Sequence, residues 1–457
     1  MNENREKVTS HELEPLKLRH IAAYGSGEFG IALTWQMTAL FLLNFFTDVY
    51  GITAAAAGTI FLIARPWDAV NDPIMGFIAD RTKTRWGNYR PYLLFAVIPL
   101  AVFNILLYIT PDFSATGKFF WALVIYIFWG MAFTATQLPY GSLTAAYTQD
   151  QQERTSLAAS RMFFSMLGIL FLSVVTVMLV KMFPSDQIGY PVVVSIYTVF
   201  VILLFWLVFA VVRERVQPEG REKYSIRDMI SLLIQNKALM TVNVAVFLMG
   251  TATTIRMSMA KYYIDYNLGN PGLFPVLMGI VVISMALGAV VSPFLNKHME
   301  KKNIYIIGMI LFVLGDLGIY FAPYTSITLI QVLMGFTGLG SGMVFTLVWA
   351  MVADTVEYGE WKTGKRAEGI TYSCYSFFSK LAFAAGGASG GYLLHASGYV
   401  PLAVQTPSAD HMIRALFTLA PVICGSLAVI VMQTYKLDGE TFQRILDELK
   451  ERQEMKH

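Results

Sequence analysis

Two aspartates, Asp68 and Asp72, stand one helical turn apart in a stretch of the chain that is otherwise mainly apolar. Asn71 lies beside Asp72, and Arg65 precedes Asp68 on the same helix face. Two carboxylates this close in a medium of low dielectric repel each other and do not both stay ionised unaided. A bound cation, a shared proton or a nearby arginine would each relieve the repulsion.

Sodium is one candidate for that cation, because hard cations prefer oxygen ligands and two carboxylates, an amide and a hydroxyl would supply them. The alternative is an ion pair with Arg65 that only holds helices together, although buried ion pairs contribute little to stability. Pro66 and Pro73 bracket the group, and each removes a backbone donor, which can kink the helix and free carbonyls toward an ion.

Further ionisable side chains fall inside apolar stretches, where their cost makes each a candidate for function. They are Glu28, Arg161, Arg256, Lys261, Asp316 and Lys380. The four cations could face a shared space and hold an anionic or polyhydroxylated ligand, although Lys261 could equally extend to the outer surface. Trp35 could offer an aromatic face to a sugar ring or serve packing alone.

All six histidines fall in tails, loops or the ends of apolar stretches. A histidine proton relay or a histidine metal centre at the middle of these stretches is therefore excluded. We expect a protein that is not an enzyme, with no cofactor and no metal beyond a possible sodium ion.

The amino-acid composition indicates which kind of structure carries these charged side chains. Of the 457 residues, 55% are hydrophobic and only 14% are charged, against about 25% in soluble domains. The mean hydropathy is +0.53. These values exclude a disordered chain, and the net charge of +3 is too small to suggest nucleic-acid binding. Cys374 and Cys424 lie in apolar runs and are expected to be small core residues.

Twelve stretches are long and apolar enough to cross a membrane as helices. They run near 26–49, 55–79, 91–110, 118–141, 155–182, 191–212, 238–266, 273–296, 303–322, 326–352, 369–396 and 411–433. Of the 34 Lys and Arg residues, 26 fall in the connections and tails on the side of the N-terminus. This asymmetry predicts that both termini are cytoplasmic. The polar start of the chain lacks the pattern of a cleavable signal.

The longest polar interval divides the chain into two halves of six spans each. We expect a cytoplasmic N-terminal segment, a first half, a central cytoplasmic loop, a second half and a cytoplasmic tail, at residues 1–25, 26–212, 213–237, 238–433 and 434–457. The tail has apolar residues at helical spacing and is predicted to be an amphipathic helix, either on the membrane surface or docked on the protein. An all-α membrane protein of twelve transmembrane helices in two such halves resembles the major facilitator fold.

Longer motifs then resemble one family, the glycoside–pentoside–hexuronide:cation symporters, of which melibiose carriers are members. The first motif is Ala64–Gly76, followed by Arg85-Trp-Gly87 and Arg90-Pro91, and the second covers 353–360 and 362–369. Phe46-Thr47-Asp48 of the first span adds a third, and the resemblance extends from about Leu18 to the tail.

The resemblance implies roles for residues at matching positions. It implies a cation site of Asp68, Asn71, Asp72 and Thr134. It implies sugar contacts from Arg161, Lys380, Ser376 and Phe345, to which we add Gln137, Trp35 and Arg256 as substrate candidates. The loop after the second span, with Asp80, Arg81 and Arg85, resembles a signature by which such transporters latch the inward mouth, and the alternative is a plain positive-inside loop. The interval 213–237 and the loop 353–369, which contains Asp354, Glu357 and Glu360, would act as further cytoplasmic gates.

The sequence departs from the melibiose-carrier pattern at positions that bind the sugar in those carriers. Ala32 and Gln137 stand where those carriers have sugar-binding acids, and Gly141 replaces a tryptophan. Arg256 adds a cation where they have an apolar residue. Loss of acids and gain of a base favour an acidic sugar, such as a glucuronide, hexuronate or sulfonated sugar, bound by Arg161 or Arg256. The strings Val356-Glu-Tyr-Gly-Glu360 and Pro139-Tyr-Gly-Ser-Leu143 are similar to the glucuronide-carrier branch.

We therefore expect a monomeric, multi-pass symporter in a bacterial inner membrane that is surrounded by lipid and imports a glycoside together with sodium or a proton. A neutral pentoside or oligosaccharide is the alternative substrate. A non-sugar exporter of the same fold, a membrane-embedded enzyme and a non-transporting sensor are the rivals from other classes.

Overall fold

The computed structural model describes residues 16–148, 150–215, 234–364 and 368–454, and its regular elements in these ranges are helices. The predicted 1–25 segment and the 213–237 loop lie largely outside them. The first part of the chain contains α1 (Leu18–Asn44), the π-helix η2 (Phe45–Val49), α2 (Ala54–Arg81), α3 (Arg90–Phe95), α4 (Val97–Leu106), α5 (Ala115–Tyr147), α6 (Gln151–Val180) and α7 (Asp186–Val211).

The second part of the chain is also built of helices. It contains α9 (Lys237–Tyr262), the π-helix η3 (Tyr263–Asn267), the 3₁₀ turn η4 (Pro271–Leu273), α10 (Phe274–Leu295), α11 (Lys301–Phe321), α12 (Ile327–Thr363), α13 (Glu368–Ala396), α14 (Pro407–Phe417), α15 (Leu419–Gln433) and α16 (Gly439–Glu454). Both η2 and η3 continue a long helix by one π turn, and a glycine with positive φ follows each, at Gly51 and Gly269.

Among the described residues, nine helical segments are long and apolar enough to cross a membrane. The other three predicted spans are helical too, but α2 carries its charged group, α13 is rich in serine and glycine, and the span 91–110 is divided into α3 and α4. The predicted loop 353–369 is mostly wrong, because α12 continues to Thr363 and ends at Gly364, whose positive φ stops the helix.

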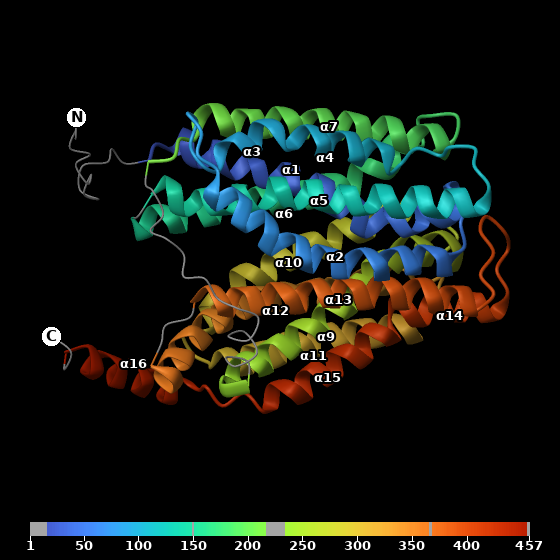
Figure 1. The fold of residues 1–457 in the computed structure, drawn as a ribbon. Helices are drawn as coiled ribbons and strands as arrows, with labels where there is room; N and C mark the ends of the chain where they lie inside the picture. The colour runs from blue at the N-terminus through green and yellow to red at the C-terminus, as the bar shows by residue number, and fades with distance from the viewer. Residues whose placement is uncertain (1–15, 149, 216–233, 365–367, 455–457) are drawn as a thin grey trace.

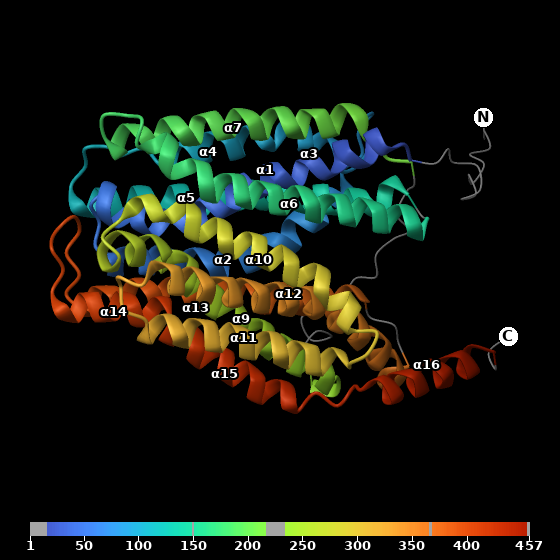
Figure 2. The ribbon, with the colours of Figure 1, turned by 180° about the vertical axis from the view of Figure 1, so that it is seen from behind.

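The helices form two bundles, α1–α7 and α9–α15, which lie one above the other in Figure 1 and again from behind in Figure 2. Within the first, α1 packs on α6 and α7, and α2 packs on α5. Within the second, α12 packs on α10 and α11, and α9 packs on α13 and α15. The main contacts between the bundles are those of α2 with α13, α6 with α10, and α1 with α9.

The bundles approach each other closely where α2 begins and α13 ends. A Cβ at Gly391 would stand 2.5 Å from the carbonyl oxygen of Ala54, and a Cβ at Gly58 would stand 3.1 Å from that of Ala388. Glycine at these positions lets the two backbones touch. Thr59 and Tyr392 add a hydrogen bond of 2.8 Å between their hydroxyls. This junction lies far from the start of α1 and from α16, which share the opposite end of the molecule (Figure 1).

Helix α16 is docked on the second bundle. Ile445 and Leu449 are buried in its apolar core. The Trp361 indole donates a hydrogen bond of 2.6 Å to Glu448, and Arg452 donates one of 3.0 Å to the carbonyl oxygen of Trp361. Of the two placements that the sequence left open, the structure has the docked one.

Candidate functional site

Asp72 is the centre of a cluster built by three helices. Its carboxylate accepts a hydrogen bond of 3.0 Å from Thr134 of α5 and pairs with the Lys380 ammonium of α13. The same ammonium lies 3.4 Å from the carbonyl oxygen of Asp68. The structure therefore brings together Asp68, Asp72, Thr134 and Lys380 across the junction of the two bundles. The ammonium at Asp72 comes from a distant helix, which spacing along one helix could not reveal.

Asp68 lies deeper in the cluster, with its side chain buried against α5. A Cβ at Gly130 would stand 2.6 Å from an Asp68 carboxylate oxygen, so glycine is needed for this approach. Gly130 and Thr134 are one turn apart on α5, and they place that helix against both aspartates. Gly130 is thus a positioning residue that the sequence did not single out.

Asn71 completes the oxygen-rich set. Its side chain is buried, and its Nδ2 atom has no hydrogen-bond partner among the described residues. A side-chain amide can be turned to present either its oxygen or its nitrogen. Two carboxylates, a hydroxyl and this amide form a hard-oxygen donor set, which fits a monovalent cation such as sodium.

A second cluster surrounds Arg161 on α6. The guanidinium Nε and Nη2 atoms both lie 2.8 Å from the same oxygen of Glu28 on α1. The guanidinium also stacks over the Tyr140 ring at 5.0 Å, and the Tyr140 hydroxyl donates a hydrogen bond of 2.6 Å to the carbonyl oxygen of Tyr24. The pair keeps contact with solvent, since the two side chains are 28% and 15% exposed. The sequence identified the arginine but not Glu28 or Tyr140 as its partners.

Helix α5 connects the two clusters. Thr134 contacts Asp72, and Tyr140 contacts Arg161, six residues or about 9 Å further along the helix axis. Gln137 lies midway and is exposed, and a Cβ at Gly141 would meet no atom within 4 Å. Near the two clusters α5 thus carries an exposed amide side chain and open space.

The remaining substrate candidates lie on the helices of the other bundle or at the junction. Phe345 of α12 is 43% exposed, and Ser376 is partly buried one turn before Lys380. Trp35 packs against Trp129 and Phe133 and meets Phe383 of α13 edge-on at 5.1 Å. Its faces are used for packing, which supports the structural interpretation of this tryptophan.

Arg256 differs from the expectation. Its Nε donates a hydrogen bond of 3.0 Å to Asp316 of α11, and its guanidinium stacks over Phe417 at 4.8 Å. The arginine and aspartate side chains are only 8% and 0% exposed, and Thr337 donates a further hydrogen bond to the same carboxylate. This arrangement argues against the prediction that Arg256 binds an acidic sugar, because its charge is paired inside the second bundle. Lys261 likewise pairs with Asp265 on its own helix instead of extending outward.

The predicted gate residues lie near the end that carries α16. Arg81 and Arg85 stack on Phe77 and Trp86, and Asp354 accepts two hydrogen bonds from Lys301. Glu357 and Glu360, the other predicted gate residues of α12, are partly buried. The Asp80 side chain lies outside the described part of the structure.

Glu214, which the sequence did not single out, organises the loop before α3. Its carboxylate accepts hydrogen bonds from the backbone N–H groups of Asn88, Tyr89 and Arg90, at 2.8, 2.7 and 3.0 Å. Gly87 has φ of +107° and leaves room for that carboxylate. A helix start offers such unpaired donors to an acid.

The opposite end carries a cluster around Asp48 that joins the bundles. One carboxylate oxygen accepts hydrogen bonds from Thr47 and Tyr399 (both 2.6 Å), and the other accepts from Asn44 (3.0 Å) and Tyr266 (2.7 Å). Burial, with Tyr262 and Asp48 nearby, raises the pKa of Tyr399, so its hydroxyl stays a donor. The sequence showed Asp48 only as part of a motif.

Comparisons with known proteins now identify the family. The family model described as MFS/sugar transport protein matches residues 23–439. The chain belongs to this family. It is 36% identical to the uncharacterized symporter YjmB of Bacillus subtilis (strain 168), over 97% of this chain and 98% of that one.

Two further relatives carry substrate names. The isoprimeverose transporter of Lactiplantibacillus pentosus is 34% identical, over 91% of this chain and 88% of the relative. The glucuronide carrier protein homolog of Escherichia coli (strain K12) is 33% identical, over 97% of each chain. The crystal structure of a D-xylose-proton symporter shares the fold, with a TM-score of 0.66 at 13% identity over 92% of this chain and 97% of that one. The protein is thus a multi-pass membrane transporter of the sugar symporter class and not an enzyme.

Proposed function

We propose that the protein imports a glycoside together with a monovalent cation by alternating access, and that the Asp72–Lys380 pair couples the two. The observation that carries this proposal is the contact of an ammonium from one bundle with a carboxylate of the other, inside an oxygen-rich cluster. Sodium or a proton would serve as the coupling cation at Asp68 and Asp72, with Asn71 and Thr134 as further ligands.

The mechanism follows from competition for Asp72. In the described arrangement Lys380 occupies the place where a mobile cation would neutralise the carboxylate. A cation that binds the aspartates removes the partner of Lys380 and leaves a positive charge without a carboxylate. An anionic substrate then gains a site, and by linkage the substrate strengthens cation binding by the same factor.

The substrate would lie along α5 between the two clusters. The separation of about 9 Å between Thr134 and Tyr140 suits a sugar ring that reaches from the released Lys380 toward Arg161. Gln137 would donate and accept hydrogen bonds with hydroxyls, and the space at Gly141 would admit the substituent of a glycoside. Phe345 and Ser376 would contribute from the other bundle.

An acidic glycoside is the preferred substrate class, because Lys380 offers a charge that a carboxylate or sulfonate would neutralise, and the name of the glucuronide relative supports it. A neutral pentoside or oligosaccharide is the second candidate. The name of the isoprimeverose relative and the Glu28 carboxylate already paired with Arg161 favour that alternative.

We also propose twelve transmembrane helices with both termini in the cytoplasm of a bacterial cell, in the inner membrane, as a monomer. In this orientation the Asp48 cluster closes the outer side. The two hydrogen bonds that Asp48 accepts from Tyr266 and Tyr399 of the second bundle would break when the transporter opens outward, so the cluster would act as the outer gate.

Uptake in proteoliposomes tests the function. Purified protein would be given a panel of acidic and neutral glycosides under imposed sodium or proton gradients, and we expect gradient-dependent accumulation of an acidic one. Asp72→Asn should abolish the dependence on the gradient, while Asp112→Asn in an exposed loop should not. No accumulation of any sugar under either gradient would contradict the proposal.

A further inference from the structure

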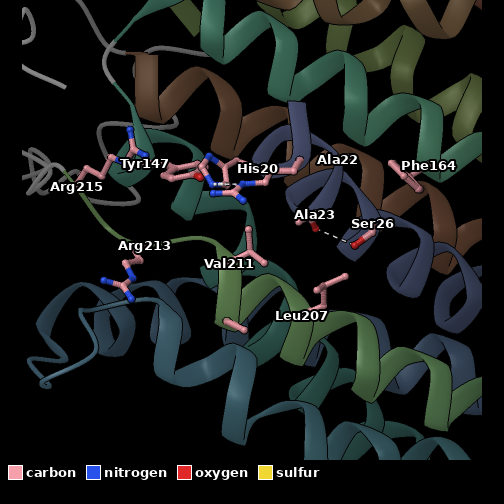
Figure 3. A pocket seen from close by; sticks show the side chains of 12 residues that line it. His20, Ala22, Ala23, Ser26, Tyr147, Phe164, Leu207, Val211, Arg213 and Arg215 are labelled. Carbon is pink, nitrogen blue, oxygen red and sulfur yellow. Dashed lines mark hydrogen bonds between the residues drawn. The ribbon is translucent and has the colours of Figure 1, made fainter. Parts of the chain in front are cut away.

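A cavity of about 760 Å³ opens at the α16 end of the first bundle, and the residues that line it belong to neither cluster of the site. Figure 3 shows it between α1, α6 and α7, with Tyr147 of α5 at one side. One part of its wall is apolar and consists of Ala22, Ala23, Phe164, Leu207, Ala210 and Val211. The other part carries Arg19, Arg213 and Arg215. The cavity therefore combines an apolar wall with a cationic rim.

The acid nearest in sequence to this rim points elsewhere. Glu214 stands between Arg213 and Arg215, but its carboxylate is engaged by three backbone N–H groups at the start of α3. The backbone N–H of Arg215 donates to the carbonyl oxygen of Ala146, and its guanidinium stacks over Tyr147 at 5.2 Å, so α5 positions this arginine. Arg19 and Arg213 are exposed.

His20 adds a polar group inside the rim. Its Nε2 atom lies 3.3 Å from the Nε of Arg19, and its Nδ1 atom is buried with no hydrogen-bond partner among the described residues. In Figure 3 the imidazole lies between the arginines and the apolar wall. A ring nitrogen can donate to an anionic oxygen, so His20 can add a donor to those of the arginines that line the same cavity.

We propose that this cavity binds the phosphate headgroup of an anionic phospholipid, with an acyl chain against its apolar wall. Basic pockets between membrane helices on the cytoplasmic side bind such headgroups. Arginine suits phosphate because its planar donors match two phosphate oxygens at once. Leu207 is 44% exposed and Ala210 is exposed beside it, so the apolar wall continues outward along α7 as an acyl chain would.

The position of the cavity favours a lipid over free phosphate. It lies where α1 begins and α7 ends, near Trp206, whose indole donates a hydrogen bond of 3.3 Å to the carbonyl oxygen of Leu94. Tryptophan is enriched at the level of the headgroups. A free anion would use only the cationic rim and leave the apolar wall in contact with water.

Thermal unfolding of the full-length, detergent-purified protein tests the proposal, because a ligand that binds the native state raises the unfolding temperature. The probes are phosphatidylglycerol, phosphatidylethanolamine and inorganic phosphate at equal concentrations. We expect phosphatidylglycerol to raise the unfolding temperature by several degrees, and the other two to change it much less.

Variants locate the effect. Arg19→Gln with Arg213→Gln should remove most of the rise, while the control pair Lys297→Gln with Arg444→Gln, which removes the same charge from the same end, should keep it. Ala210→Trp fills the wall without a charge change and should also reduce the rise, so a folding defect in the first pair would not leave the proposal untested.

Three results would overturn the proposal. An equal rise with phosphatidylethanolamine would show a general lipid effect, and an equal rise with inorganic phosphate would show a free-anion site. An unchanged rise in both the arginine variant and Ala210→Trp would place the lipid elsewhere.

Discussion

Among the described residues, two arginine–carboxylate pairs lie in membrane-spanning helices, one in each bundle, and their surroundings differ. Arg161 and Glu28 retain 28% and 15% of their side-chain exposure, whereas Arg256 and Asp316 retain 8% and 0%. The first pair stands beside open space on α5, and the second is sealed by Phe417, Met334 and its own bundle. An arginine inside a span is thus either accessible to a ligand or part of the internal packing, and exposure distinguishes the two.

The sealed pair should show the largest effect on stability. Asp316→Asn leaves the Arg256 charge buried without its partner, which we expect to cost about 3–5 kcal/mol in the free energy of unfolding. Thermal unfolding in detergent measures this loss. The double variant Arg256→Met with Asp316→Leu should recover most of it, and a mild effect of Asp316→Asn alone would contradict the assignment of this pair to packing.

A substitution of Lys380 tests the role of the ion pair that joins the two bundles. In Lys380→Gln the neutral amide no longer competes for Asp72 and offers no charge to an acidic substrate. We expect uptake of an acidic glycoside to fall by about 100-fold, or about 3 kcal/mol in transport efficiency, with a smaller loss for a neutral one. Parallel uptake assays with both substrate classes measure the ratio, and equal losses would favour the neutral alternative.

The accessible pair should affect transport more than stability. Arg161→Gln removes one partly exposed ion pair, so we expect less than about 1 kcal/mol in unfolding free energy, but at least a tenfold loss of uptake. Glu28→Gln frees the guanidinium and serves as the comparison. A loss of stability as large as that of Asp316→Asn, with uptake retained, would remove the distinction between the two pairs.

The Asp48 cluster should give the smallest effect. Asp48→Asn replaces one acceptor oxygen by an NH₂ group that faces hydroxyl donors, which we expect to weaken outer closure by about 1 kcal/mol. Cysteine labelling of Ser258→Cys, which is buried beside Gly390 of α13, reports whether the outer side opens more often. Unchanged labelling would show that the hydrogen bonds do not hold the gate.

The degree to which residues could be identified in advance depended on where their partners lie. Asp68, Asn71 and Asp72 were recognisable because helical spacing alone places them on one face. Glu28 was noticed as an intramembrane acid, but its pairing with Arg161 joins α1 to α6 and leaves no periodic signal. The continuation of α12 to Thr363 was missed because charged residues beyond the membrane are compatible with both helix and loop.

The sequence by itself determined that the chain is a helical membrane protein, because local hydropathy shows the spans. It also determined which few charged residues lie in those spans and, from the spacing of its motifs, the family to which the chain belongs. Only the tertiary structure decided that Lys380 lies on Asp72 and that Arg256 is sealed against Asp316. The physical reason is that hydropathy records what a residue costs in the membrane, whereas the partner that offsets this cost comes from another helix.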